Sequence, residues 1–490
     1  MNPVRTLVFL GVVAGFSGLL LAACAWVEGG GFLSRETLEL WSRALLLDHE
    51  GFLLQQGQSF YPPLPFLLTL AVQTFVPAGP PPPVLVSCLL GGLMAATWRA
   101  DLRERGDVGR LASLAIVALL VLNPLFLRCV AEGPAQVLLV IGVWTVGRGF
   151  FSLRLSGSAH DMMRFALGLL ILAFSHRYGM MLVLAAFPFA SVAARPSLLT
   201  SSPHGYLVAL FFPVAGAAFA YLFLGAVFSD GLVETLLSPP GRAGADQALQ
   251  GWQAAAWRLC LALCVAPAVL GALAAARATA RLALPMAATA ATVVAAALLD
   301  LAYGYQPELA LALAPMLTAA FVAIRYWPTK RGRTPAALAL SLVGVFGGAL
   351  TLGLSTAPGA SAWRAAALSP APVTLLAEVG EVAAFLRGRD DLMMDPQASP
   401  ELVVALGGPP GVVTPGDPRF ERALARGRPA SAWVAVRAEG LPAGRPDAVA
   451  RAFGAALGPE SPTYELVLRQ EDWRIYRRRT LPLMQMGGAT

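Results

Sequence analysis

Two carboxylates and an imidazole stand together at Asp48, His49 and Glu50, shortly after the first long apolar stretch of the chain. A proline-interrupted aromatic segment that begins near Tyr61 then leads back to apolar sequence. A carboxylate at the boundary between membrane and water can take the proton of a hydroxyl group while the hydroxyl oxygen attacks a carbon atom. Asp48 is therefore the predicted base or acceptor-binding acid, and Glu50 a second acid beside it. The alternative is that both acids are solvated loop residues.

Two further loops place polar residues beside apolar runs. Glu132 precedes a run that begins at Pro134, where a negative charge would also stabilise the start of a helix by about 0.5 kcal/mol. His176, Arg177 and Tyr178 form a short cationic turn between two apolar runs. An arginine in such a turn either binds an anionic group through its planar fork of donors or extends from apolar sequence to the membrane surface.

The composition excludes an ordinary soluble globular protein, because 57% of the 490 residues are hydrophobic and only 13% are charged. The net charge of +7 does not indicate nucleic acid. Residues 371–490 contain 14 basic and 14 acidic side chains, whereas residues 1–370 contain 22 and 15. The excess belongs to the apolar part of the chain, without a basic stripe interleaved with aromatic residues, so it indicates orientation in a membrane.

The apolar runs predict about eleven transmembrane helices, since roughly 20 apolar residues cross the hydrocarbon layer of a bilayer. They lie at 7–26, 84–98, 111–128, 134–150, 165–175, 178–194, 205–227, 252–276, 283–300, 308–325 and 335–354. We interpret the proline-flanked segment 62–76 as a helix at the membrane surface. With a cytoplasmic N-terminus, the inner loops then hold 15 of the 22 basic residues and the outer loops 11 of the 15 acids, as the positive-inside rule requires.

The five cysteines lie within or beside apolar runs, which indicates neither a disulfide framework nor a zinc site. One alternative concerns Cys24, because the apolar run that ends there resembles a lipoprotein signal. Cleavage at that point would remove the leader and lipidate the cysteine. The run is also long enough to remain as a membrane span.

From about residue 371 the pattern predicts a small extracytoplasmic α/β domain. Its expected elements are helices at 373–386 and 446–457, strands at 392–394 and 433–436, and a hairpin of 464–468 with 473–476. The expected order is helix-strand-helix-strand-helix-hairpin, with one helix between the two strands. The expected division is a transmembrane domain at 1–354, a linker at 355–370 and the α/β domain at 371–490. Within the first domain, residues 27–83 form an extracytoplasmic loop with interfacial helices. The predicted fold class is thus an α-helical polytopic membrane protein with this small C-terminal domain.

The acidic pair followed by Tyr61-Pro62-Pro63-Leu64 resembles the first extracytoplasmic loop of the type C glycosyltransferase superfamily. The order of helices and strands after residue 371 is similar to the periplasmic tails of many bacterial members. The resemblance covers the whole chain in architecture and extends to mannosyltransferases that use dolichyl-phosphate-mannose and to aminoarabinose transferases. In many members the acids of this loop are adjacent, whereas here His49 separates them.

The resemblance implies roles for individual residues. Glu132 corresponds to a second acid that orients substrate or binds a divalent metal, and Arg177 to a cation near the donor phosphate. The remaining predicted substrate-binding residues are His49, Tyr61, His176, Tyr178 and Tyr305, the last of which lies in a late outer loop. Whether a magnesium or manganese ion takes part stays open, because some members use a metal and others do not.

The function implied by the resemblance is transfer of a sugar, a hexose or a pentose, from a polyprenyl-phosphate donor to an envelope glycan, lipid or protein, with inversion at the anomeric carbon. The enzyme would lie in the bacterial inner membrane, with a cytoplasmic N-terminus and a periplasmic C-terminal domain. Two alternatives remain, a transporter of lipid or glycan and a non-catalytic membrane scaffold that retains the fold. The sequence identifies neither the sugar nor the acceptor, nor the oligomeric state.

Overall fold

The computed structural model describes residues 3–50, 62–76, 79–104, 108–228, 280–303, 330–355, 358–368, 375–437, 447–458, 461–470 and 472–479. The helical backbone alone is described at 48–50, 104, 198, 201, 224–226, 228, 280–283, 297, 300–303, 330–331, 358 and 375–378. The chain forms two compact units. The first, here called the membrane unit, comprises Met1–Thr37 and Gln58–Thr374. The second, the C-terminal unit, comprises Leu38–Gly57 and Leu375–Thr490. Each unit has hydrophobic clusters of its own.

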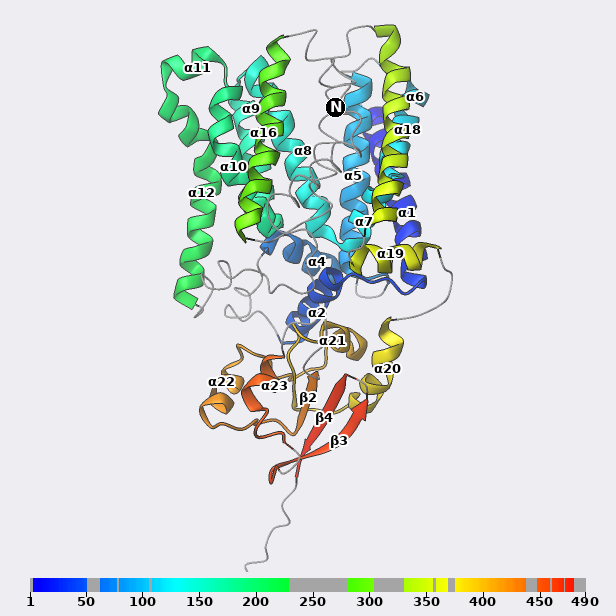
Figure 1. Ribbon diagram of the computed structural model, residues 1–490, viewed down its shortest axis with the longest axis vertical. Helices are drawn as coiled ribbons and strands as arrows, with labels where there is room; N and C mark the ends of the chain where they lie inside the picture. Colours follow the sequence, from blue (N-terminus) through cyan, green and yellow to red (C-terminus); the bar gives the residue numbers. More distant parts are fainter. Residues whose placement is uncertain are drawn as a thin grey trace, which may run out of the picture. The chain divides into compact units, whose positions relative to one another are not determined.

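The described part of the membrane unit is helical (Figure 1). Its helices are α1 (Pro3–Gly29), the first turn of α2 (Arg35–Glu50), α4 (Pro63–Phe75), α5 (Pro82–Glu104), α6 (Arg110–Val121), α7 (Pro124–Glu132), α8 (Pro134–Leu155), α9 (Ala159–Ser175), α10 (Arg177–Ala193), α11 (Pro196–Ser201), α12 (Pro203–Phe228), α16 (Ala280–Tyr303), α18 (Lys330–Leu354) and α19 (Pro358–Leu368).

Five of the described helices are long and apolar enough to cross a membrane: Pro3–Gly29, Pro82–Arg103, Pro134–Leu155, Pro203–Phe223 and Gly332–Leu354. The pair α6 and α7, bent by 61°, would add a sixth. Nine of the eleven predicted apolar runs coincide with described helices. The runs at 252–276 and 308–325 lie outside the described residues, and the count of about eleven transmembrane helices stays a prediction. Helix α4, predicted at the membrane surface, packs against α5, α8 and α9.

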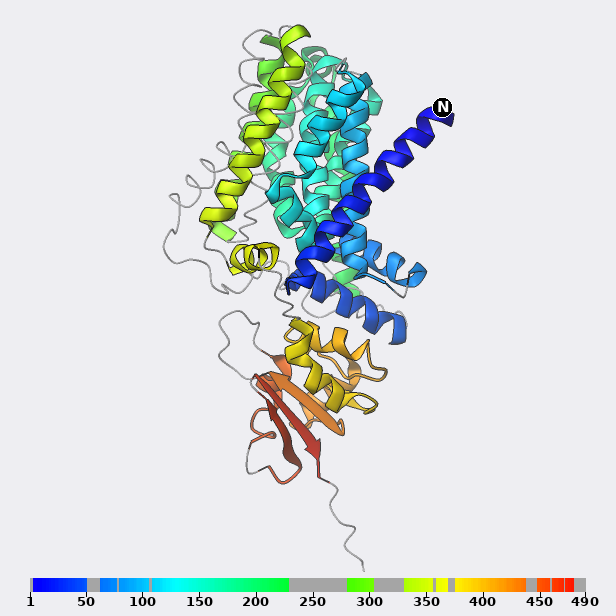
Figure 2. The same ribbon diagram turned by 90° about the vertical axis from the view of Figure 1, so that its right-hand side faces the viewer.

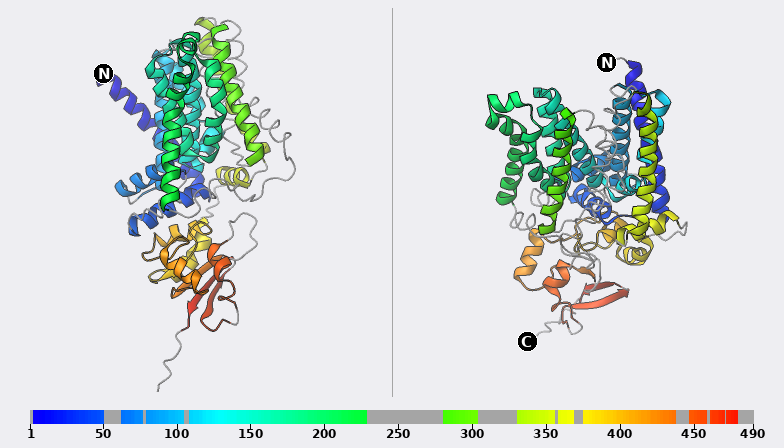
Figure 3. Two further views of the ribbon diagram at one scale, coloured as in Figure 1. Left: turned by 90° about the vertical axis from the view of Figure 1, so that its left-hand side faces the viewer. Right: turned by 45° about the horizontal axis from the view of Figure 1, so that its top comes forward.

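Two hydrophobic clusters hold the membrane unit together. One gathers buried side chains of α1, α5, α6 and α7, and the other those of α8, α9, α10, α12 and α16. Figures 1 and 3 show these groups on opposite sides of the unit. Helices α8 and α9 follow one another through a short turn and pack along their length. The start of α8 and the end of α9 therefore lie at the same end of the helix bundle.

A buried asparagine marks the bend between α6 and α7. The Oδ1 atom of Asn123 accepts a hydrogen bond from the N–H of Leu125 (3.0 Å), and its Nδ2 donates to the carbonyl of Gly344 in α18 (3.1 Å). Pro124 begins α7 directly after it. Because a proline cannot continue the hydrogen bonding of the preceding helix, the chain turns here, and the asparagine satisfies groups that the break exposes.

The C-terminal unit contains a four-stranded sheet in the order β1-β2-β4-β3. Strand β1 (Leu392–Met393) is parallel to β2 (Trp433–Arg437), whereas β4 (Trp473–Arg478) runs antiparallel to both β2 and β3 (Tyr464–Gln470). One face packs on α20 (Leu375–Leu386) and α21 (Pro400–Leu406), and the other on α22 (Pro418–Ala425) and α23 (Ala448–Phe453). The register pairs Ala435 with Ile475 on the first face and Val434 with Tyr476 on the second.

All four strands expected after residue 371 are observed, but three features differ from the expected layout. Two helices rather than one separate β1 from β2. The segment 355–370, expected as a linker, contains α19, whose Trp363 lies in a core cluster of the membrane unit. The third concerns α2, in which Leu46 is 8% exposed and belongs to the core of the C-terminal unit. Trp363 of α19 and Leu46 of α2 are therefore buried in cores that the local sequence does not predict.

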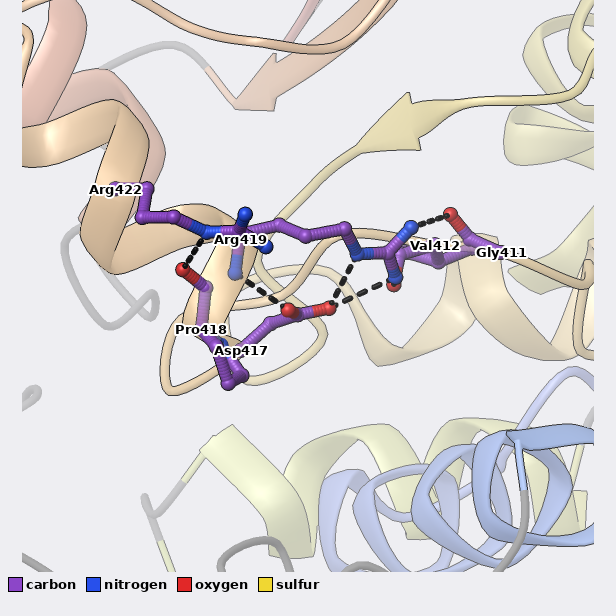
Figure 4. A network of polar contacts seen from close by, with 6 residues as sticks. All are labelled: Gly411, Val412, Asp417, Pro418, Arg419 and Arg422. Atoms are coloured by element: carbon purple, nitrogen blue, oxygen red, sulfur yellow. Dashed lines mark hydrogen bonds and ion pairs between the residues drawn. The ribbon is translucent and has the colours of Figure 1, made fainter.

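The turn before α22 is held by an arginine and an aspartate (Figure 4). Asp417 caps the helix by accepting a hydrogen bond from the N–H of Arg419 (2.7 Å), and its other oxygen accepts from the guanidinium (2.8 Å). Arg419 also donates to the carbonyls of Gly411 and Val412, at 3.3 Å each. These contacts give Asp417 a role in capping the helix.

Candidate functional site

The candidate site is centred on an ion pair at the end of α7. Arg128 and Glu132 are four residues apart and therefore lie on the same face of this helix. The Nε atom of Arg128 lies 2.6 Å from Oε1 of Glu132, and the two side chains are only 7% and 17% exposed. A charged pair removed from water to this extent is held by its partners, because either charge alone would be costly to bury.

The start of α2 is anchored to the same place. The hydroxyl of Ser34 accepts a hydrogen bond from the N–H of Thr37 (3.0 Å) and so caps the helix. The same hydroxyl donates to the carbonyl oxygen of Glu132, and the hydroxyl of Thr37 lies 3.3 Å from that oxygen. The first turn of α2 and the last residue of α7, almost a hundred positions apart in the sequence, therefore lie together.

A second carboxylate, Glu36, lies at this junction. Its Oε2 accepts a hydrogen bond from Nε2 of Gln136 in the first turn of α8 (3.4 Å). Its Oε1 is 3.3 Å from the point that a Cβ on Gly133 would occupy. Two acids, one arginine and one amide thus meet where α7 passes into α8. We call Glu36, Arg128, Glu132 and Gln136 the junction cluster.

Gly133 is the residue that permits this arrangement. Its φ of +137° is a backbone conformation that side-chain-bearing residues rarely adopt. Replacement of Gly133 by alanine should therefore lower the free energy of unfolding by about 1–3 kcal/mol. Thermal unfolding of the purified protein in detergent would measure the loss. Gly18→Ala in α1 is the matched control, because no atom lies within 4 Å of the added Cβ, and alanine favours helix. Equal transition temperatures for the two variants would contradict the prediction.

The predicted residues of the first loop are only partly described. Asp48, His49 and Glu50 form the last turn of α2, but their side chains lie outside the described residues, as do Tyr61 and Tyr305 altogether. Asp48 belongs to the C-terminal unit, whereas Glu36 and Glu132 belong to the membrane unit. The assignment of Asp48 as base and of Glu50, His49, Tyr61 and Tyr305 to substrate stays a prediction.

The cationic turn joins α9 to α10 at the same end of the bundle as the start of α8. His176 caps α10, because its Nδ1 atom accepts a hydrogen bond from the N–H of Tyr178 (3.0 Å). Arg177 begins the helix and is half-buried. Tyr178 is 1% exposed and lies in the hydrophobic cluster of α8, α9 and α10. Its ring therefore contributes to packing, while His176 and Arg177 stand at the helix end.

Burial and a neighbouring charge keep His176 neutral. Burial of the ring, together with the positive charge of Arg177, lowers the pKa of His176 to about 4. The folded protein should therefore show no titration of His176 between pH 5 and 8. Because an unfolded histidine takes up a proton near pH 6.5, stability should fall as the pH falls from about 6.5 to 4.

NMR of protein labelled with ¹⁵N-histidine measures this directly. His176→Gln assigns the resonance among the four histidines of the chain. We expect the tautomer with its proton on Nε2, since Nδ1 is an acceptor. A titration midpoint near 6.5 would contradict the burial of this ring.

Arg128, Glu36 and Gln136 were not among the residues predicted from the sequence. The signals were present, because Arg128 and Glu132 have i,i+4 spacing. Ser34, a residue type that favours helix starts, is followed by an acid in the first turn. Nothing local, however, indicates that these two helix ends meet. Only the return of the chain after α1 brings Glu36 to Gly133 and Gln136.

Metal binding by Glu132 stays a proposal. Within the described ranges, no group of three or more His, Cys, Asp or Glu side chains is placed to hold a metal ion. The carboxylates of Glu36 and Glu132 are oxygen ligands of the kind that magnesium and manganese prefer. Glu132 shares its charge with Arg128, so an ion there would compete with an existing ion pair.

No protein-family model matches the chain, and no curated protein matches it significantly. The chain is similar to a crystal structure of ArnT from Cupriavidus metallidurans bound to undecaprenyl phosphate. The TM-score is 0.57 at 12% identity, over 96% of this chain and 98% of that chain. For ArnT in the apo state the TM-score is 0.57 at 13% identity, over 95% and 98%. The chain therefore shares the fold of ArnT over nearly its whole length, and this is the architecture that the sequence resemblance implies.

Proposed function

We propose that the protein is a membrane glycosyltransferase that moves a sugar from a polyprenyl-phosphate donor to a hydroxyl group of an envelope glycan, lipid or protein. The observation that carries the proposal is the fold. ArnT has been solved with undecaprenyl phosphate, and it shares its architecture with 96% of this chain. The buried polar cluster at one end of the bundle supports the same reading.

The proposed reaction requires a base, a cation and a way to hold the lipid. A carboxylate takes the proton of the acceptor hydroxyl, the hydroxyl oxygen bonds to the anomeric carbon, and the bond from that carbon to the phosphate oxygen breaks. The polyprenyl phosphate leaves with its electron pair and a negative charge. A nearby arginine stabilises that charge. Attack on the face opposite the leaving group inverts the anomeric configuration.

Two carboxylates are candidates for the base. Asp48 is the candidate from the sequence, and Glu36 is the candidate from geometry, because it lies in the junction cluster with Glu132 and Arg128. Glu132 would orient the acceptor or bind a divalent metal, and Arg177 would contact the donor phosphate. A metal ion, if it takes part, would stabilise the phosphate charge.

The position of the acids favours transfer over transport. Transporters place polar and charged residues at mid-membrane depth in broken helices. Here Glu36 and Glu132 lie at helix ends, beside the first residues of α2 and α8, and neither lies at the bend between α6 and α7. The end of the bundle that carries them would face the periplasm, with the N-terminus in the cytoplasm of a bacterial cell.

Sugar transfer by the purified full-length protein tests the proposal. A panel of radiolabelled undecaprenyl-phosphate sugars is supplied together with envelope extract as acceptor, with and without EDTA. The expected result is label in an acceptor fraction that depends on the protein and on the polyprenyl chain. The absence of transfer across hexose and pentose donors would favour the scaffold. Transfer abolished by EDTA and restored by manganese or magnesium would assign the metal.

A further inference from the structure

Three arginines gather at the end of the bundle opposite the junction cluster. Arg99 and Arg103 lie in the last two turns of α5, and Arg110 is the first residue of α6. The charges of Arg103 and Arg110 act on Arg99. The Nε atom of Arg99 is buried and has no hydrogen-bond partner among the described residues. Like charges collected in this way repel one another unless an anion lies between them.

Three other arginines at this end have acceptors of their own. Arg148 of α8 is paired with Asp101 (2.6 Å). Arg154 donates to the carbonyl of Ala194 (2.7 Å), and Arg195 donates to the carbonyl of Ser156 (2.9 Å). These contacts tie the ends of α5, α8 and α10 together. The group of Arg99, Arg103 and Arg110, here called the arginine triad, is different because its charges act on one another and the buried Nε atom of Arg99 has no hydrogen-bond partner among the described residues.

Helix α1 packs tightly on α5 at the end near the junction cluster. The Sγ atoms of Cys24 and Cys88 are 3.9 Å apart. A Cβ on Gly92 would lie 2.1 Å from Oγ of Ser17, so only glycine allows this approach. The face of α5 toward α1 therefore contains positions 88 and 92. By helical periodicity, residue 95, Arg99 and Arg103 lie on the same face of α5 as positions 88 and 92.

The side chains of α1 become more exposed toward its N-terminal end. On the face of α1 that contains Cys24, the residues Cys24, Leu20 and Ser17 are buried. Val13 and Phe9, farther along the same face, are half-buried. Leu7 and Leu10 are 69% and 55% exposed. Figure 2 shows the N-terminal half of α1 slanting away from the remaining helices. The arginine triad thus lies at the end of α5 from which the N-terminal half of α1 diverges.

We propose that an anionic phospholipid binds at this place, with its phosphate at the arginine triad and an acyl chain between the N-terminal half of α1 and α5. A bilayer leaves no empty space beside a diverging apolar helix, so lipid chains fill it. The three positive charges select the headgroup, because each arginine near an anionic lipid surface contributes a favourable interaction. The lipid belongs to the leaflet opposite the junction cluster, and the proposal is independent of the transferase reaction.

Native mass spectrometry of the full-length protein tests this inference. The protein is released from nanodiscs that contain equal amounts of phosphatidylglycerol and phosphatidylcholine, and the retained lipids are counted. We expect the wild type to retain one phosphatidylglycerol in preference to phosphatidylcholine. Arg110→Gln should weaken retention about fivefold, and Arg99→Gln with Arg110→Gln about 25-fold, since about 1 kcal/mol per arginine corresponds to a factor of about five.

The matched control is Arg164→Gln, which removes one charge from an exposed position of α9 at the same end of the bundle. It should retain phosphatidylglycerol as the wild type does. Equal retention by the double variant and the control would overturn the proposal. If the double variant does not fold, the test is the retention of phosphatidylglycerol and phosphatidylcholine by the wild type. Equal retention of the two lipids would then contradict the proposal. If undecaprenyl phosphate at equal concentration displaces phosphatidylglycerol, the arginine triad binds a different lipid phosphate. This result would also overturn the proposal.

Discussion

Replacement of Glu36 by glutamine should lower sugar transfer by about 10²–10⁴-fold, the range that a positioned general base contributes. Glutamine keeps the shape of the side chain and its contact with Gln136, but it cannot accept a proton at neutral pH. Transfer from labelled polyprenyl-phosphate sugar would be measured with equal amounts of folded protein. The expected loss lies in turnover, because the substituted side chain still occupies the same volume beside Gly133.

Glu39→Gln is the matched control, since Glu39 lies in the same helix, with its Oε2 atom 3.9 Å from Nη2 of Arg43. A variant of Asp48 to asparagine, measured beside it, decides between the two candidate bases. Loss of transfer in Glu36→Gln with near-normal transfer in Asp48→Asn assigns the base to the junction cluster. The reverse result assigns it to Asp48. Near-normal transfer in both would remove both carboxylates from that role.

Replacement of Arg128 by leucine should lower the free energy of unfolding by about 3 kcal/mol, because Glu132 would keep a negative charge that has lost its ion pair in a largely buried place. The thermal transition of the membrane unit should shift to lower temperature. The carbonyl of Glu132 also accepts from Ser34, so a displaced α7 would loosen the start of α2. Transfer should therefore fall in this variant as well.

The double variant Arg128→Leu with Glu132→Leu separates charge from packing. Replacement of both partners of a buried pair by apolar residues is often neutral for stability, so the double variant should recover most of the transition temperature. Its transfer activity should stay low if Glu132 orients the acceptor. A double variant as unstable as Arg128→Leu would show that the loss arises from packing.

The membrane architecture could be predicted from the sequence because it depends on local patterns. Nine apolar runs coincide with described helices, and the strands at Leu392–Met393, Trp433–Arg437, Tyr464–Gln470 and Trp473–Arg478 stand where alternating patterns placed them. The Tyr61-Pro62-Pro63-Leu64 motif indicated the type C fold, which the two ArnT structures confirm. Each of these features depends on neighbouring residues, because the length and periodicity of a run and its flanking turn residues determine a single helix or strand.

The candidate site could be predicted only in part. Glu132 was predicted because the family resemblance implies a second acid in this loop, and the structure places it in the junction cluster. Its partner Arg128 could have been found from the i,i+4 spacing, but Glu36 and Gln136 could not. Their contact joins residues one hundred positions apart, and it requires the path of the chain through α1, the turn at Ser34 and the left-handed conformation of Gly133.

The sequence by itself determined that this chain is a polytopic helical protein with a small α/β unit, because the hydrophobic effect and strand periodicity act on local composition. Tertiary structure alone decided which acids meet and which segments belong to which core. Leu46 is buried with the C-terminal unit and Trp363 with the membrane unit, although neither position is marked by its neighbours. Such contacts depend on the packing of distant elements, and packing is a property of the whole chain.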